Sequence, residues 1–145
     1  MPTILVVCGP NLNLLGEREP HIYGTETLEE ISAKLRARGA AEGVEVEVFQ
    51  SNTEGAIIDK LHAVRKTAQA IVLNAGALSH SSYALRDAIA AIQIPVIEVH
   101  MTNVLARGEF RTSLVLAPAC RGLIFGFGVE SFILGLEAAM RLSGP

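Results

Sequence analysis

The sequence predicts an α/β fold in which one parallel β-sheet lies between two layers of helices. Short runs of aliphatic and β-branched residues alternate with amphipathic stretches along the 145 residues, which is the pattern of repeated βαβ units. The first run, residues 4–8, is apolar without interruption, as expected for a central strand covered on both faces. No linker, repeat or low-complexity segment breaks the pattern. We therefore expect residues 1–145 to form a single domain.

Five strands and four main helices are expected. The strands cover residues 4–8, 44–49, 70–73, 96–99 and 122–125, and the helices cover residues 28–39, 57–64, 83–92 and 129–142. The second strand alternates apolar and polar residues, which is typical of a sheet edge with one wetter face. Thr27 and Glu30 have the spacing of a capping box before the first helix. Right-handed crossovers between these units predict a doubly wound, flavodoxin-like sheet of five parallel strands in three layers.

Composition and charge narrow the class of protein. Half of the residues are hydrophobic, yet no apolar run approaches the roughly 18 residues of a membrane span. A hydrophobic share this high in a small chain favours further apolar burial between subunits. The net charge of −3 and the lack of a basic run argue against nucleic-acid binding. Because the start of the chain lacks the features of a signal peptide and Cys8 and Cys120 lack CxxC spacing, we expect a cytoplasmic protein with free thiols.

A long polar loop follows the first strand. The stretch GPNLNLLGEREPHIYG, residues 9–24, exceeds the usual connection of about 4–6 residues and carries several polar and titratable side chains. Long ordered loops are often functional, so this one is a candidate site. Asn11 and Asn13 can equally be turn residues, and Tyr23 can be an aromatic residue that holds the loop in place.

Polar residues also follow the third and fourth strands. Ligands of open α/β sheets bind beyond the carboxyl ends of the strands, so residues from the three places are expected to meet. They are Asn11, Asn13, Arg18 and Tyr23 after the first strand, Asn74, Gly76, Ser79, His80, Ser81 and Ser82 after the third, and His100, Met101, Thr102, Asn103, Arg107 and Arg111 after the fourth.

Glu98 and His100 stand two residues apart in an apolar strand, so their side chains share one face. An unpaired buried carboxylate is costly. We therefore expect Glu98 to hold one imidazole nitrogen of His100, which favours the protonated ring and makes it a proton donor. A purely structural Glu–His pair is the alternative.

The sequence lacks the residue patterns that several other kinds of site require. The four histidines have no ligand-like spacing and there is no HExxH motif, so no metal is expected. There is no Walker A motif, and Gly126-Phe127-Gly128 is too short a match to a dinucleotide fingerprint. The only lysines are Lys34, Lys60 and Lys66, all on predicted helices, which disfavours a Schiff base.

Four stretches together resemble the type II 3-dehydroquinate dehydratases. They are GPNLNLLGEREPHIYG, QSNTEGAIID (50–59), NAGALSHSSYALRDA (74–88) and EVHMTNVLARGEFR (98–111), in the family's order. The closing GLIFGFG and SFILGLEAA also resemble the family's last strand and helix. The resemblance implies a cofactor-free trans elimination of water from 3-dehydroquinate that yields 3-dehydroshikimate, in the shikimate or the quinate pathway.

The resemblance also implies the roles of the residues that react. Tyr23 is implied to be the base in its ionised form, which the cationic Arg18 favours. His100 is implied to protonate the departing hydroxyl. Asn11 is implied to stabilise the enolate through a bound water.

Further residues are implied to bind the substrate. Backbone N–H groups at Met101 and Thr102 would face its carboxylate, and we expect Thr102 to cap a short helix there. The residues implied to hold the ring hydroxyls and the carboxylate are Asn74, His80 and Arg111, with Gly76, Glu98 and Arg107 in support.

The resemblance extends to motion and assembly. The loop around Arg18 and Tyr23 is implied to be a lid, for which Gly16 and Gly24 are plausible hinges. Asp87 is implied to reach the site of a neighbouring subunit, in a homo-oligomer of trimers that build a dodecamer.

The chain departs from the family's usual residues at a few positions. They are Ala75, Leu78, Leu105, Gly108, Thr112 and Ser113. None is an implied catalytic group, so these departures bear on affinity, loop stiffness and subunit contacts. Two alternatives stay open: a catalytically silent relative that binds a cyclic hydroxy acid, and another lyase or isomerase acting on a polyhydroxy ring acid.

Overall fold

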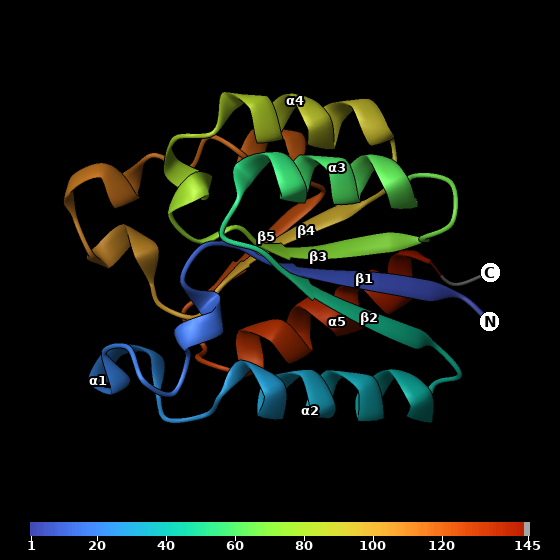
Figure 1. Ribbon diagram of the computed structural model, residues 1–145, viewed down its shortest axis with the longest axis horizontal. Helices are drawn as coiled ribbons and strands as arrows, with labels where there is room; N and C mark the ends of the chain where they lie inside the picture. Colours follow the sequence, from blue (N-terminus) through green and yellow to red (C-terminus); the bar gives the residue numbers. More distant parts are fainter. Residues whose placement is uncertain (144–145) are drawn as a thin grey trace.

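Five parallel strands form one sheet in the order β2-β1-β3-β4-β5 (Figure 1). A computed structural model describes residues 1–143 of the chain. Its strands are β1 (Thr3–Cys8), β2 (Glu45–Gln50), β3 (Ala70–Asn74), β4 (Val96–His100) and β5 (Gly122–Phe125). The flavodoxin-like arrangement predicted from the sequence is confirmed.

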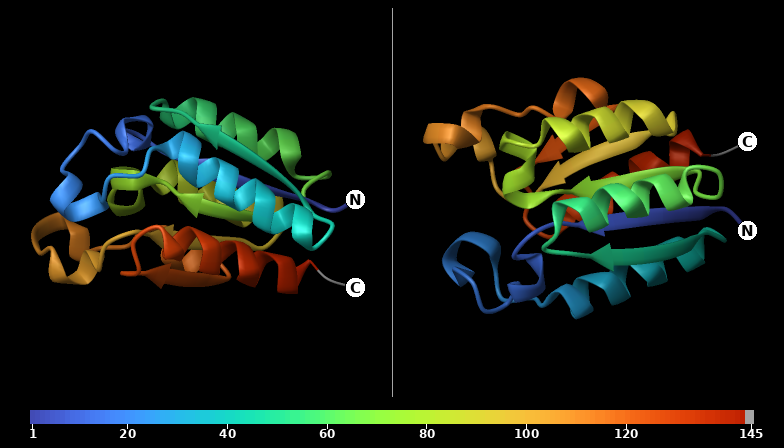
Figure 2. Two further views of the ribbon diagram at one scale, coloured as in Figure 1. Left: turned by 90° about the horizontal axis from the view of Figure 1, so that it is seen from below. Right: turned by 45° about the horizontal axis from the view of Figure 1, so that its top comes forward.

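Helices cover both faces of the sheet and complete the three layers (Figures 1 and 2). Helices α2 (Leu28–Ala41) and α5 (Glu130–Leu142) lie on one face, and α3 (Glu54–Val64) and α4 (Tyr83–Ile92) lie on the other. Within residues 1–143, no helix is long and apolar enough to cross a membrane.

Strand β1 is buried on both faces, which explains the unbroken apolar run at residues 4–8. Ile4 and Val6 enter the core beneath α2 and α5, whereas Leu5 and Val7 enter the core beneath α3 and α4. Successive residues of a strand point to opposite faces of the sheet. Because helices cover both faces, all four side chains are fully buried. The strand also ends at Cys8, a buried free cysteine whose pKa burial raises to about 12.

The predicted features of β2 and α2 are confirmed. Strand β2 pairs only with β1 among the described strands. Its Val46 is buried, while Glu45 and Glu47 are exposed. At the start of α2 the hydroxyl of Thr27 accepts from the Glu30 N–H at 3.2 Å, and the Thr27 N–H donates to the Glu30 carboxylate at 3.1 Å. These two hydrogen bonds complete the capping box.

The loops contain short helices, of which the sequence predicted only one, after the fourth strand. They are α1 (Pro20–Tyr23) and the 3-10 helices η1 (Leu12–Leu14), η2 (Gly76–His80), η3 (Val104–Ala106), η4 (Glu109–Thr112) and η5 (Ala117–Ala119). Each is one turn or little more, which is too short to show a helical period of apolar residues. The bounds of the longer elements differ from the predicted ones by at most three residues.

Helix α5 approaches the sheet closely at Gly135. A Cβ there would lie 2.6 Å from Val99 Cγ1 and 3.1 Å from Val72 Cγ1. These two valines are β-branched and buried, so they have little freedom to move aside. Glycine at this position therefore sets how closely α5 lies against β3 and β4.

The substitution Gly135→Ala is expected to lower the free energy of unfolding by about 1–2 kcal/mol, because the added methyl group overpacks this contact. Urea unfolding measures the change. Gly55→Ala, on α3, is the matched control: nothing lies within 4 Å of its added Cβ, so stability should stay unchanged or rise by less than about 1 kcal/mol. A Gly135→Ala protein as stable as the unaltered one would contradict this account of the packing.

Candidate active site

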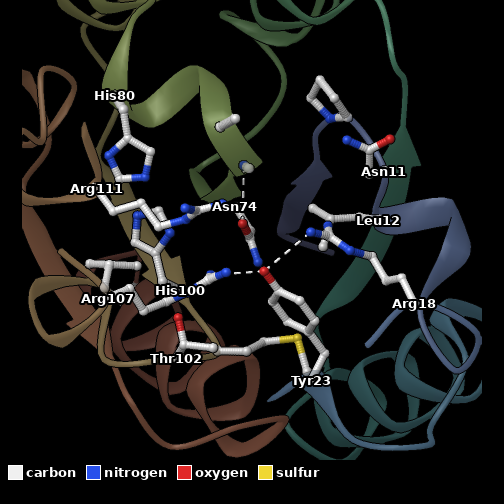
Figure 3. A pocket seen from close by; sticks show the side chains of 15 residues that line it. Asn11, Leu12, Arg18, Tyr23, Asn74, His80, His100, Thr102, Arg107 and Arg111 are labelled. Atoms are coloured by element: carbon white, nitrogen blue, oxygen red, sulfur yellow. Dashed lines mark hydrogen bonds between the residues drawn. The ribbon is translucent and has the colours of Figure 1, made fainter. Parts of the chain in front are cut away.

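A cavity of about 140 Å³ lies at the carboxyl edge of the sheet, and most of its lining follows β1, β3 and β4 (Figure 3). The chain leaves β1 toward β2 on one side of the sheet and leaves β3 toward β4 on the other. The loops therefore diverge between β1 and β3 and leave a crevice. The structure brings together in it eleven of the thirteen residues to which the resemblance assigns a role, whereas Asn13, Ser79, Ser81, Ser82 and Asn103 do not line it. The eleven are Asn11, Arg18, Tyr23, Asn74, Gly76, His80, His100, Met101, Thr102, Arg107 and Arg111.

Two guanidinium groups converge on the hydroxyl of Tyr23 (Figure 3). Arg18 Nη2 donates to the hydroxyl oxygen at 3.2 Å, and Arg107 Nη1 donates at 2.8 Å. Both cations also lie near the ring, at 4.3 Å and 5.4 Å from its centroid. Positive charge therefore lies on two sides of the phenol oxygen. The sequence pointed to Arg18, whereas the contact with Arg107, 84 residues further along, has no signal in the spacing.

The imidazole of His100 contacts a buried carboxylate, as predicted. Its Nε2 lies 2.6 Å from Glu98 Oε2, and the side chain of Glu98 is fully buried. The carboxylate accepts the proton on Nε2, so Nδ1 is the nitrogen left for a ligand. The other carboxylate oxygen faces the thiol of Cys120 at 4.0 Å. Burial and the charge of Glu98 raise the pKa of Cys120 to about 12, which keeps this thiol protonated.

His80 stacks beside His100, with ring centroids 6.2 Å apart and planes 25° from parallel. His80 Nδ1 lies 2.8 Å from the carbonyl oxygen of Ser113, so this nitrogen carries the proton. Burial lowers the pKa of His80, and positive charge on His100 and Arg111 lowers it further, while the Ser113 carbonyl opposes the shift. A neutral His80 leaves its Nε2 as a hydrogen-bond acceptor.

Asn74 and Gly76 hold the end of β3 against the first loop. The Asn74 side-chain oxygen accepts from the Gly76 N–H at 3.2 Å, which leaves the Asn74 amide nitrogen as a donor toward the cavity (Figure 3). Gly76 has φ +60°, and a Cβ there would lie 3.0 Å from the carbonyl oxygen of Pro10. Both observations require glycine at this position.

The prediction that Thr102 caps a short helix is wrong. The helix after β4, η3, begins at Val104, and its N-cap residue is Asn103, whose side chain makes no capping hydrogen bond. Asn103 intervenes, so Thr102 stands one position too early to act as the cap. Met101 and Thr102 nevertheless line the cavity.

Two of the thirteen residues to which the resemblance assigns a role do not line the cavity. Glu98 is buried and contacts His100, which does line it. Asp87 is exposed on α4, outside the cavity of its own chain. The lining residues that the sequence analysis missed are Pro10, Leu12, Ala77 and Val104, and nothing in their apolar or turn-forming character distinguishes them from packing residues.

The electrostatics of the cavity suit an anion. Its lining includes Arg18, Arg107 and Arg111, and no carboxylate among the described residues faces it. Across residues 1–143, no group of three or more His, Cys, Asp or Glu side chains is placed to hold a metal ion. A substrate that carries a carboxylate would meet compensating positive charge here.

Comparisons with known proteins agree with this geometry. The family model described as dehydroquinase class II matches residues 2–140. The chain belongs to the class II dehydroquinase family. It is 52% identical to a 3-dehydroquinate dehydratase of Desulforudis audaxviator, with 96% of this chain and 93% of that one covered. It is 54% identical to one of Bacillus licheniformis, with 97% of each chain covered.

Solved structures of the family share the fold. The crystal structure of the type II dehydroquinase from Butyrivibrio crossotus superposes with a TM-score of 0.93 at 44% identity, over 95% of this chain and 97% of that one.

The positions expected from the sequence to depart from the family's usual residues do not line the cavity. Gly108 has φ +71° and ψ −174°, a conformation that suits glycine alone. Ala75 is buried, Leu78 packs on the core beneath α3 and α4, and Leu105 is exposed. Ser113 contributes its backbone carbonyl to His80.

The titration of His80 should be shifted toward acid, because its neutral form is favoured in the cavity. An NMR titration of the imidazole signals is expected to place its pKa below the ordinary 6.5. His100→Asn should raise that pKa, since it removes a neighbouring group that carries positive charge when protonated. The signals of His62, exposed on α3, should not respond to the same substitution. A His80 midpoint at or above 6.5, or one that does not move in His100→Asn, would contradict this assignment.

Proposed function

We propose that this chain is a lyase that removes water from 3-dehydroquinate to form 3-dehydroshikimate. The observation that carries the proposal is that two reactive groups of opposite kind face one cavity. Tyr23, between two guanidinium groups, is suited to accept a proton, and His100, on a buried carboxylate, is suited to donate one. Membership of the class II dehydroquinase family and the names of its relatives support the choice of substrate.

Tyr23 is the base in this proposal. A tyrosine in water titrates near 10, so a tyrosine base that works at neutral pH needs its charged form stabilised by about 4 kcal/mol. Two guanidinium donors at 3.2 Å and 2.8 Å supply charge-assisted hydrogen bonds of the required sign. The phenolate removes a proton from the carbon next to the substrate ketone, and the C–H electron pair forms an enolate.

The enolate oxygen then needs stabilisation as its charge develops. Asn11 is the proposed group, acting through a bound water, and it lines the cavity on the first loop. The collapse of the enolate expels the hydroxyl group at the next carbon and forms the conjugated double bond of the product.

His100 is the acid. It transfers a proton from Nδ1 to the departing hydroxyl, which leaves as water, while Glu98 retains its hydrogen bond to Nε2 throughout. Proton transfer from Tyr23 to His100 through solvent restores both groups for the next turnover.

The remaining cavity residues are proposed to bind the substrate. Arg111 and the backbone N–H groups of Met101 and Thr102 would face its carboxylate. The Asn74 amide and His80 Nε2 would hold ring hydroxyls, as donor and acceptor respectively. Gly76 supports this subsite by allowing the close approach of the first and third loops.

The segment that carries Arg18 and Tyr23 is proposed to act as a lid. Its flanking glycines, Gly16 and Gly24, have φ values of +93° and +83°, and between them the short helix α1 carries Tyr23. Closure would bring the base and one of its cations to the substrate together and exclude water.

We also propose the assembly and setting of the enzyme. Residues 1–145 would form one catalytic domain, and trimers would build a dodecamer in which Asp87, exposed on α4, reaches a neighbouring site. The two free thiols suit the reducing cytoplasm. The same elimination would serve aromatic biosynthesis or quinate breakdown.

The decisive measurement follows the ultraviolet absorbance of the conjugated enone in the product, which the substrate lacks. Protein incubated with 3-dehydroquinate should show a steady rise in absorbance. Tyr23→Phe and His100→Ala should each lower kcat by at least about 100-fold, because each removes a proton-transfer group. No absorbance rise with the unaltered protein would refute the proposed reaction. A near-normal rate in either variant would refute the role assigned to the residue that it replaces.

Matched controls exist for both variants. Tyr83→Phe changes the only other tyrosine, which is exposed on α4, and His62→Ala changes an exposed histidine on α3. Both controls should retain the unaltered rate, and circular dichroism should show the same fold in all four variants.

Arg107 should support the proposed base together with Arg18. Arg107→Gln removes one of the two guanidinium donors from the Tyr23 hydroxyl and should lower kcat about tenfold, because a charge-assisted hydrogen bond is lost. Arg121→Gln, an exposed change near the amino end of β5, should retain the unaltered kcat. An unaltered kcat in Arg107→Gln would show that Arg107 does not act on the base.

A further inference from the structure

Asn11 has an unusual backbone for the residue that the proposed reaction places at the enolate. Its φ is 72° and its ψ is −4°, in the left-handed region. Of the non-glycine residues in the described part of the chain, only Asn11, Glu19 and Gln93 have positive φ. Asparagine tolerates this region better than most residues, but it persists there only when neighbouring groups hold it.

The side chain of Asn52 contacts the backbone of Asn11. The backbone N–H of Asn11 donates to the side-chain oxygen of Asn52 at 2.9 Å, across 41 residues of sequence. This hydrogen bond and the left-handed conformation occur at the same residue. The rest of the turn is closed by the Leu14 N–H, which donates to the Asn11 carbonyl at 3.0 Å.

Gln50 fixes the orientation of Asn52. Its Nε2 donates to the same Asn52 oxygen at 3.1 Å and to the Gly9 carbonyl at 3.2 Å. Because two donors converge on one oxygen, the Asn52 amide has a single orientation that satisfies both. The three side-chain hydrogen bonds therefore tie the two residues that flank Pro10 to the end of β2.

The sheet brings these groups together. Strands β1 and β2 are parallel neighbours in which Cys8 is opposite Gln50, and the Ser51 N–H donates to the Cys8 carbonyl at 3.0 Å. The segments that follow β1 and β2 leave the sheet side by side, which places residues 50–52 along residues 9–11. Gln50 and Asn52 do not line the cavity, so they contact the loop and not a ligand in it.

We propose that Asn52, oriented by Gln50, is a positioning residue that holds the backbone of Asn11 so that its amide side chain faces the developing enolate. The proposal deepens the proposed function and rests on it for the role of Asn11. No direct contact between Asn52 and the substrate is involved. Asn52 acts by keeping in advance a loop conformation that stabilises the transition state.

The kinetic signature follows from this indirect role. An interaction that acts mainly in the transition state changes kcat and kcat/KM together and leaves KM nearly unchanged. Asn52→Ala is therefore expected to lower kcat about tenfold while KM stays within about twofold. Asn52→Asp keeps an oxygen that accepts both hydrogen bonds, so it should remain within about threefold of the unaltered kcat.

A double-mutant cycle with Asn11 tests the route of the effect. In an Asn11→Ala background, Asn52→Ala should change kcat by less than about twofold, because the side chain that it positions is already gone. Asn13→Ala is the matched control: this exposed asparagine of the same loop does not line the cavity, and its loss should leave kcat unchanged. An Asn52→Ala loss as large in the Asn11→Ala background as in the unaltered protein would overturn the proposal.

Hydrogen exchange supplies a readout that needs no turnover. In the substrate-free protein, Asn52→Ala should speed exchange of the Asn11 amide, while Asn13→Ala should not. Unchanged exchange in Asn52→Ala would overturn the positioning role. The two proposals also fail in different ways. No turnover by the unaltered protein refutes the dehydration, whereas unaltered turnover that Asn52→Ala does not slow refutes the positioning role alone.

Discussion

The convergence of two guanidinium groups on the hydroxyl of Tyr23 is the interaction on which the rest of the site depends. Arg18 and Arg107 donate to this oxygen from distant parts of the chain, at 3.2 Å and 2.8 Å. Arg18 belongs to the same loop as Tyr23, whereas Arg107 follows β4. Both hydrogen bonds therefore form only when the first loop lies against the loop after β4, which couples the surroundings of the proposed base to the position of the first loop.

The proposed acid, His100, has its partner on the same strand. Glu98 and His100 are both on β4, and their contact of 2.6 Å follows from the period of a strand in the middle of a packed sheet. Both side chains of this half of the site are buried in the core. In the proposed reaction, a buried acid opposite a base on a loop would let substrate enter and product leave while the contact between Glu98 and His100 is kept. The hydrogen bonds of Gln50 and Asn52 connect the start of the first loop, at Gly9 and Asn11, to the end of β2.

Elements with a strong periodic signal were predictable from the sequence, and those without one were not. The uninterrupted apolar run of β1, the alternation in β2 and the capping box of Thr27 each correspond to a local physical rule, and the structure confirms all three. Helix α1 and the 3-10 helices are single turns whose conformation depends on the loops that they close. The capping role expected for Thr102 failed for the same reason, because one residue, Asn103, decides where η3 begins.

The sequence by itself determined the flavodoxin-like sheet, the candidate residues at its carboxyl edge and the pairing of Glu98 with His100. These depend on residues near one another in the chain or on the general rule that parallel strands end at one edge. Only the tertiary structure decided that Arg107 shares the hydroxyl of Tyr23, that His80 stacks on His100 and that Asn52 holds the backbone of Asn11. Each of these contacts joins side chains from different loops. Their geometry depends on how closely the strands and helices pack, and no spacing in the sequence encodes it.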